Sequence, residues 1–386
     1  MTAAQAERDP VERHFAEMAA ALDGGPAGLT GGPLRRLAGS APVRPGSALT
    51  GRLCLDLFDA QLASRHVDLA ARWLRARGAG FYTIGSSGHE GNAGVAAALR
   101  LTDPALLHYR SGAFYLARAQ QAVPPRDGVR DMLLGLVAAV EEPIAGGRHK
   151  VFGHPQLNVI PQTSTIASHL PRAMGLAFAV GRAARLGRPT TWPADAIVLA
   201  SMGDASVNHS TARGAINTAA YCAYQHLPLP LLLVVEDNGI GISVRTPPGW
   251  VAAATEPVPG AGYFHAGGSD LASVYDTALA AAAWVRERCT PAILHLRMVR
   301  FGGHAGSDVE SGYRSAQETA ADLAADPLLG TARLLVDAGL LTGQEITARY
   351  EESRARVLGL AGQVAEAPRL ATAEAVLAPL APHRPD

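Results

Sequence analysis

The feature that most limits the fold of this chain is a series of apolar runs that alternate with helix-like segments. Runs at residues 196–203 and 230–238 read A-I-V-L-A-S-M-G and P-L-L-L-V-V-E-D-N, and a helical pattern at 208–224 separates them. A helix at 272–289 and a run at 292–301 follow. This alternation predicts an α/β fold, with a parallel sheet covered by helices on both faces.

The rest of the chain divides into three parts. Residues 1–48 predict a short helix and a Gly/Pro-rich arm with little to pack. Residues 49–340 are expected to form the main domain, with helices near 53–77 and 89–101 and a buried helix at 169–187. Residues 341–386 predict a C-terminal helical extension, and the last 60 residues, which are helical and polar, predict a peripheral cap or partner surface.

Composition excludes several classes of protein. The formal net charge is zero, which disfavours a nucleic-acid partner, and no apolar run is long enough to span a membrane. Lys150 is the single lysine, and no Walker motif occurs. Three cysteines in apolar segments predict buried thiols in a reducing compartment. The acidic N-terminal residues fit neither a transit peptide nor a secretory signal, so a cytoplasmic location is expected.

Polar groups end two consecutive predicted strands. Asp204 follows Gly203 directly, and Asn238 ends the next run. Adjacent parallel strands would bring both to one sheet edge, outside which ligands bind. A carboxylate, an amide oxygen and a loop carbonyl suit Mg²⁺, and the helix that starts near Asn208 would favour an anion there. Together they suggest a diphosphate held through a metal, although each motif alone is more typical of a cap or turn.

Three further patterns are weaker. G-S-S-G-H-E-G departs from a nucleophile elbow because His89 occupies the final glycine position, and H-E-G-N-A has no second histidine for H-E-x-x-H. G-I-G-I-S is not the G-x-G-x-x-G of a nicotinamide-binding protein. All three predict packing or turn residues, and Glu90 predicts a structural residue at a helix start.

Four ordered motifs carry a family resemblance. They are Tyr109-Arg110 within G-F-Y-T through R-S-G-A, the stretch P-Q-T-S-T-I-A-S-H-L-P-R-A-M-G, the pair Gly203-Asp204-Ala205 and Asp237-Asn238, and F-G-G-H-A-G-S-D-V-E-S-G-Y-R-S. From Leu53 to Asp337 the chain resembles the α subunit of thiamine diphosphate-dependent 2-oxo acid dehydrogenases of the pyruvate, branched-chain and acetoin types. Residues 49–340 would then be the thiamine diphosphate-binding domain.

The resemblance implies a role for each matching residue. Asp204, Asn238 and the backbone carbonyl of Ile240 would bind Mg²⁺. The residues implied to contact thiamine diphosphate are Tyr109, Arg110, Ser164, Ile166, Gly203, Asp204, Ala205, Ser206, Asn238 and His304. Arg110 would bind the diphosphate and Ile166 would hold thiamine bent, while His304 would be catalytic and donate hydrogen bonds to developing charge.

Two residues depart from the family pattern, which reads Gly-Asp-Gly and Asn-Asn. Ala205 replaces the last glycine and could crowd the approach of the backbone to the diphosphate, and Asp237 replaces the first asparagine. Neither change removes an implied metal ligand. Ala305 occupies the place of a regulatory serine in mitochondrial relatives, which suits a bacterial enzyme.

The implied reaction is oxidative decarboxylation of a small 2-oxo acid, with acyl transfer to a lipoyl group on an acyltransferase. The activating glutamate belongs to a β subunit in this family, which implies an obligate partner and most simply an α₂β₂ tetramer. Acetoin dehydrogenase, half of a split transketolase and a non-catalytic scaffold remain alternatives. Which 2-oxo acid is used stays open.

Overall fold

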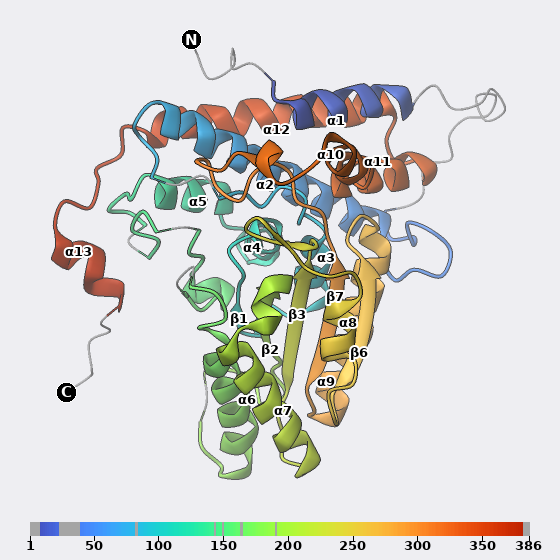
Figure 1. Ribbon diagram of the computed structural model, residues 1–386, viewed down its shortest axis with the longest axis vertical. Coiled ribbons are helices and arrows are strands. Elements are labelled where there is room, and N and C mark those ends of the chain that lie inside the picture. Colours follow the sequence, from blue (N-terminus) through green and yellow to red (C-terminus); the bar gives the residue numbers. More distant parts are fainter. Residues whose placement is uncertain are drawn as a thin grey trace.

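The computed structural model describes residues 8–22, 39–81, 84–142, 144–148, 150–162, 165–189 and 191–380. Its main sheet has five parallel strands in the order β1-β2-β3-β7-β6 (Figure 1). Those strands are β1 Ala105–Leu106, β2 Val198–Gly203, β3 Leu231–Asp237, β6 Gly262–Gly267 and β7 Ala292–Arg297. A separate antiparallel hairpin pairs β4 Ile240–Gly241 with β5 Val244–Arg245. The predicted parallel α/β sheet is therefore confirmed.

Helices surround the sheet and extend above it (Figure 1). They are α1 Pro10–Ala21, α2 Gly51–Ala76, α3 Asn92–Ala98, α4 Gly112–Gln121, α5 Gly128–Leu136, α6 Leu170–Arg185, α7 Ser210–Tyr224, α8 Trp250–Thr255, α9 Leu271–Arg288, α10 Ala316–Ala324, α11 Pro327–Asp337, α12 Gly343–Val364 and α13 Ala373–Leu377. None of the helices in the described ranges combines the length and apolarity needed to cross a membrane.

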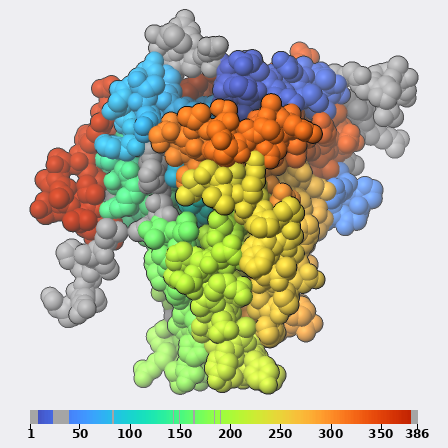
Figure 2. All heavy atoms as spheres, viewed as in Figure 1, coloured from blue at the N-terminus to red at the C-terminus, as the bar shows by residue number. Residues whose placement is uncertain are grey.

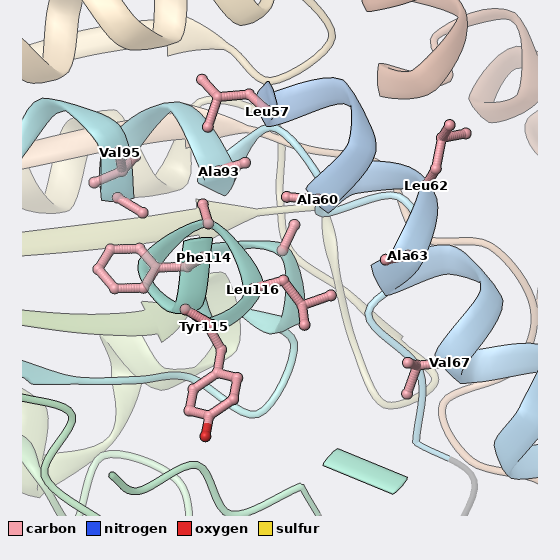
Figure 3. Packing of buried hydrophobic residues seen from close by; sticks show 14 of the residues in the cluster. Leu57, Ala60, Leu62, Ala63, Val67, Ala93, Val95, Phe114, Tyr115 and Leu116 are labelled. Carbon is pink, nitrogen blue, oxygen red and sulfur yellow. The ribbon is translucent and has the colours of Figure 1, made fainter. Parts of the chain in front are cut away.

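The sheet is buried on both faces because successive side chains of a strand point to opposite sides. On β2, Leu199 joins a hydrophobic cluster with α2, α3, α4 and α9, whereas Val198, Ala200 and Met202 join a second cluster with α6, α7 and α8. Figure 3 shows the first cluster, where Leu57 and Ala60 of α2 lie near Ala93 of α3 and Leu116 of α4. Two apolar layers therefore fix the strand ends.

Helices α1 and α12, near the two ends of the chain, pack into the body of the molecule. Phe15 of α1 is fully buried and stacks on Tyr350 of α12, with ring centroids 4.6 Å apart. Helix α12 also buries Val357 and Ala361 in the cluster that contains α2. The last 60 residues, predicted to be a peripheral cap or partner surface, therefore include a helix with one side buried against α2, and the N-terminal helix has a packing partner. The domain boundary at residue 341 stays a prediction. Most of the Gly/Pro-rich arm, residues 23–38, lies outside the described residues.

Three smaller expectations need correction. Helix α6 is amphipathic rather than buried, because Leu170 and Ala173 face the core while Gly175 is exposed. Cys54 and Cys222 are buried as predicted, but Cys289 is exposed where it ends α9 in a left-handed conformation. Strands β1 and β6 and the β4–β5 hairpin did not emerge from the sequence, since they are short or lack a long apolar run.

The packing of α1 on α12 yields a stability prediction. Phe15→Ala removes a fully buried ring, so the free energy of unfolding should fall by about 3–5 kcal/mol, as measured by denaturant titration. Glu17→Ala changes an exposed residue of the same helix and should alter that free energy by less than about 0.5 kcal/mol. Equal effects of the two substitutions would contradict the docking of α1.

Candidate functional site at the carboxyl edge of the sheet

Asp204 and Asn238 follow adjacent parallel strands, as the sequence predicts. In the pairing of β2 with β3, Gly203 lies opposite Glu236, so both strands end at the same edge. Asp204 begins a 3₁₀ turn, Asp204–Asn208, and α7 starts two residues after that turn at Ser210. The two candidate ligands are therefore neighbours at the mouth of the sheet.

Asp204 is a carboxylate held almost out of contact with water. Its side chain is 2% exposed, and its Oδ2 accepts a hydrogen bond from the Thr246 hydroxyl. Burial raises the pKa of Asp204 above its usual value, and the nearby Asp237 carboxylate adds to the rise. Among the described residues, no arginine or lysine forms an ion pair with it. A buried carboxylate without a cationic side chain is a suitable ligand for a metal cation.

The segment between Asn238 and Thr246 encloses this position. Asn238 Oδ1 accepts a hydrogen bond from the Ile240 amide at 3.1 Å, and Ile240 opens the β4–β5 hairpin. The hairpin returns the chain to Thr246, whose amide bonds the Gly239 carbonyl at 2.9 Å and whose hydroxyl reaches Asp204. One short loop thus connects the three groups implied as metal ligands, which are oxygen donors of the kind Mg²⁺ prefers.

The small residues beside Asp204 fit tightly. A Cβ added to Gly203 would lie 3.3 Å from His108 Nε2, a tight contact for a side chain. A Cβ added to Gly241 would lie 2.4 Å from the Ala205 methyl group, so the glycine of the hairpin accommodates this alanine. Ser206 is buried in the same turn. The structure therefore gives Ala205 a packing partner that the sequence comparison with Gly-Asp-Gly did not reveal.

Asp237, the second departure, has cationic and polar partners of its own. His295 Nε2 lies 2.9 Å from its Oδ2 and Arg297 Nη1 lies 3.2 Å from its Oδ1, which also accepts from the Gly239 amide at 2.9 Å. Burial raises the pKa of Asp237, but the His295 hydrogen bond and the Arg297 charge outweigh it, so this pKa is below its usual value. The carboxylate is thus matched by partners on β7.

Tyr109, Arg110 and His304 form one cluster. Arg110 is 2% exposed, and its guanidinium donates to the Gly85 carbonyl at 2.5 Å and to His304 Nδ1 at 3.2 Å. The guanidinium carbon lies 5.3 Å from the centroid of the Tyr109 ring, and that ring meets the His304 ring edge-on at 6.1 Å. The structure brings the adjacent pair Tyr109-Arg110 together with His304, which lies 194 positions after Arg110 in the sequence.

The loop that carries His304 is held by polar contacts. The His304 amide donates to Asp308 Oδ2 at 2.6 Å, and the Tyr313 hydroxyl donates to the same oxygen at 2.5 Å. The Arg300 guanidinium donates one hydrogen bond to Tyr313 Oη at 2.7 Å and another to the Ile242 carbonyl oxygen at 2.8 Å. In Figure 2 the orange segment that includes α10 lies against the yellow hairpin region. Hydrogen bonds through Arg300 therefore connect the loop that carries His304 to the loop that follows Asn238.

The remaining two predicted contacts are less clearly placed. Ser164 lies outside the described residues. Ile166 is 42% exposed in the turn before α6, next to Ala167, which has a φ of 61°. The role of Ile166 as a wedge for the cofactor stays a prediction.

Several buried charges that position the site were not recognised from the sequence. Asp68 Oδ2 accepts from the amides of Ser86 and Ser87 at 2.6 and 2.7 Å, and Lys150 Nζ lies 2.5 Å from Asp68 Oδ1. This ion pair fixes the turn whose Gly85 carbonyl receives Arg110. Lys150 is 4% exposed and serves as the counter-ion of a carboxylate. No local pattern reveals such a pair, because its members are 82 residues apart.

Glu90 is also a structural residue. It is fully buried, and its carboxylate accepts hydrogen bonds from Arg65 Nε at 2.6 Å and from the Gly88 amide at 2.8 Å. Arg65 also forms a buried ion pair with Asp326 at 2.9 Å. These contacts agree with the interpretation of Glu90 as structural. They leave no position for it as a solvent-facing acid or base.

Histidines line the inner side of the site. His89, His108 and Glu236 bring possible ligand atoms within 4.8 Å of one another, and all three are buried. Burial lowers the pKa of His108 well below its usual value, and neighbouring His89 and Arg110 lower it further, so this ring is neutral. Within the described residues, His108 Nδ1 has no hydrogen-bond partner.

Comparison with known proteins places these features in a family context. The model of the family described as dehydrogenase E1 component matches residues 60–373. The α subunit of 2-oxoisovalerate dehydrogenase from Bacillus subtilis is 26% identical over 336 residues, covering 85% of this chain and 95% of that protein. The α subunit of the pyruvate dehydrogenase E1 component from Rickettsia conorii is 29% identical over 153 residues, or 38% and 44% of the two chains.

The buried ion pair below the Arg110 turn yields a second prediction. Lys150→Met leaves the buried Asp68 carboxylate without its cation and should lower the free energy of unfolding by about 3–5 kcal/mol in a denaturant titration. Adding Asp68→Asn should recover part of that loss. Arg52→Met breaks an exposed pair with Asp56 and should cost less than about 1 kcal/mol. A Lys150→Met variant as stable as the wild type would contradict the account.

Proposed function

Because this chain belongs to the dehydrogenase E1 component family, we propose that it is the α subunit of a thiamine diphosphate- and Mg²⁺-dependent 2-oxo acid dehydrogenase. The reaction is oxidative decarboxylation of a 2-oxo acid, with transfer of the acyl group to a lipoyl-bearing acyltransferase. The supporting observation is that four candidate segments follow the carboxyl ends of four adjacent strands. Arg110 follows β1, Asp204 follows β2, Asn238 follows β3 and His304 follows β7.

The donor set of this edge fits a metal-bound diphosphate. Asp204 and Asn238 offer a buried carboxylate and an amide oxygen, and the Ile240 carbonyl completes the protein ligands in the proposal. Gly203, Ala205 and Ser206 form the turn beside it, and α7 starts nearby. Bound thiamine diphosphate would supply the carbanion-stabilising thiazolium. Mg²⁺ would neutralise the diphosphate charge that Asp204 otherwise repels.

The chain's own residues would then bind and orient the reactants. Arg110 presents a planar guanidinium that is suited to two phosphate oxygens, and Tyr109 packs beside it. His304 would donate a hydrogen bond to the charge that develops on the substrate. The hydrogen bond from the Arg110 guanidinium to His304 Nδ1 would hold the imidazole ring at the carboxyl edge of the sheet. Ser164 and Ile166 would approach the centre of the cofactor.

The same proposal requires a partner subunit. The one glutamate considered as an activating group within this chain, Glu90, is paired with Arg65 and Gly88. A β subunit would supply the activating glutamate, most simply in an α₂β₂ tetramer, with the cofactor between the subunits. Three apolar side chains are exposed near the mouth of the site: Ile242, Val244 and Val309. Their exposure supports the proposal that a partner protein covers this edge.

Activity with a 2-oxo acid tests this function directly. We expect reduction of an artificial electron acceptor with pyruvate or 2-oxoisovalerate, in the presence of thiamine diphosphate and Mg²⁺, only when this chain is mixed with its β subunit. Asp204→Ala should reduce the rate at least about 100-fold, because losing a direct ligand should exceed the 10–100-fold typical of outer hydrogen bonds.

A matched control lies at the other end of the same strand. Asp195 precedes β2, is about half exposed and pairs with Arg100, so Asp195→Ala should leave the rate unchanged. Activity of this chain alone would contradict the need for a β subunit. A stable but inactive mixture would favour the non-catalytic scaffold, and activity on sugar phosphates instead of 2-oxo acids would favour a split transketolase half.

A further inference from the structure

Two buried polar side chains, Glu236 and His89, form a series of hydrogen bonds that ends at the half-buried Asn238. Glu236 Oε2 lies 2.7 Å from His89 Nδ1, and His89 Nε2 lies 2.9 Å from Asn238 Nδ2. The His89 ring is fully buried, and Glu236 is 1% exposed. His89 comes from the turn before α3, whereas Glu236 is the second-last residue of β3 and Asn238 directly follows that strand. These two hydrogen bonds therefore connect His89 to residues that lie 147 and 149 positions later in the sequence.

The donor and acceptor roles in this series of hydrogen bonds can be assigned from the chemistry of its groups. The Glu236 carboxylate only accepts, so its short contact with His89 places a proton on Nδ1. The Asn238 NH₂ group faces Nε2 while its Oδ1 accepts from the Ile240 amide, so Nε2 carries no proton and accepts this hydrogen bond. The amide oxygen of Asn238 consequently faces away from His89, on the side where it accepts from the Ile240 amide at 3.1 Å.

The donors around Glu236 support this assignment. Its Oε1 accepts from the Ser111 hydroxyl at 2.6 Å, and its Oε2 also accepts from Asn92 Nδ2 at 3.2 Å. The Asn92 amide is itself oriented, because its Oδ1 accepts from the Phe114 amide at 2.8 Å. Glu236 is thus surrounded by donors, as an acceptor in a buried position requires.

The backbone of His89 is equally constrained. Gly88 has a φ of 96°, and a Cβ there would lie 2.3 Å from the Val299 carbonyl oxygen, so the turn closes against the start of the His304 loop. Glu90 on the other side is held by Arg65 and by the Gly88 amide. The imidazole therefore has little freedom to change its position relative to Asn238.

From these contacts we propose that His89, oriented by Glu236, is a positioning residue that keeps the Asn238 amide oxygen turned toward the cation. The inference rests on the proposed function, because it needs a cation at Asn238. An amide can present either its oxygen or its NH₂ group, and only the oxygen binds a hard cation. Partners that orient a ligand in this way typically change metal affinity 10–100-fold when they are removed.

A neighbouring series of hydrogen bonds within the same protein provides a matched control. The Tyr263 hydroxyl lies 2.7 Å from His295 Nδ1, and His295 Nε2 lies 2.9 Å from Asp237 Oδ2. This second series also joins three polar side chains through a central histidine. It ends on the residue beside Asn238, which is not a proposed ligand. Substitutions in it disturb a similar buried network without touching the amide.

The first experiment measures cation affinity. Mn²⁺ is titrated, in the presence of thiamine diphosphate, into the full chain assembled with its β subunit, and free Mn²⁺ is followed by electron paramagnetic resonance. His89→Leu removes the acceptor and should weaken Mn²⁺ binding about 10–100-fold. His89→Gln keeps one acceptor and one donor at similar spacing, so it should stay within about threefold of the wild type, as should Tyr263→Phe.

The second experiment does not depend on the cofactor. Long-range ¹H–¹⁵N correlation spectra of the histidine-labelled chain identify the His89 ring as the signal lost in His89→Gln. The expected pattern has hydrogen on Nδ1 and none on Nε2. A proton on Nε2 would overturn the inference, even where the His89→Leu variant fails to fold.

The two failures are distinguishable. Wild-type protein that binds no Mn²⁺ with thiamine diphosphate would contradict the proposed function, and the inference with it. Wild-type protein that binds Mn²⁺, together with a His89→Leu variant of equal affinity, would overturn the inference alone. An equal loss of affinity in Tyr263→Phe would also overturn it, by showing that any disturbance of this edge weakens binding.

Discussion

The parallel pairing of β1, β2, β3 and β7 is the constraint on which the site depends. Parallel strands end at the same edge, so segments that lie far apart in the sequence emerge beside one another there. The register that sets Gly203 opposite Glu236 makes Asp204 and Asn238 neighbours. The apolar layers on both faces of the sheet hold that register, because a slip of one residue would reverse which side chains are buried.

Buried ion pairs give the loops at this edge their definite positions. Lys150 with Asp68 fixes the turn that receives Arg110, and Arg65 with Glu90 and Asp326 fixes the turn that carries His89. Such pairs contribute little net stability because desolvation offsets their attraction, but removing one member leaves an uncompensated charge. We interpret them as devices that select one arrangement of the loops.

Much of this architecture could be predicted from local patterns. The long strands and the helices between them follow from apolar runs and helical periodicity, and Asp204 and Asn238 stand out because each ends such a run. The family resemblance added Arg110 and His304, which the structure places together. Weaker local signals failed: α12 was expected at the periphery because many of its residues are polar, yet one side of it is buried against α2.

The contacts that orient the site could not be predicted from a single sequence. His89 was discounted because its segment fails the patterns of known catalytic motifs, and its partner Glu236 is hidden inside a β-strand. Their interaction spans 147 residues, so no spacing rule reveals it. Asp237 likewise was known only as a replacement for the family's first asparagine, and the structure pairs it with His295 and Arg297 on β7. Tertiary contacts of this kind depend on the completed fold.

The central claim is that this edge holds a metal-bound diphosphate, and the position of the metal tests it most directly. The measurement is a crystal structure of the assembled α and β subunits with thiamine diphosphate and Mn²⁺, with the metal located by its anomalous scattering. We expect the peak between Asp204, Asn238 and the Ile240 carbonyl, at coordination distance from each. A peak at the buried cluster of His89, His108 and Glu236, or no peak at the sheet edge, would contradict the account.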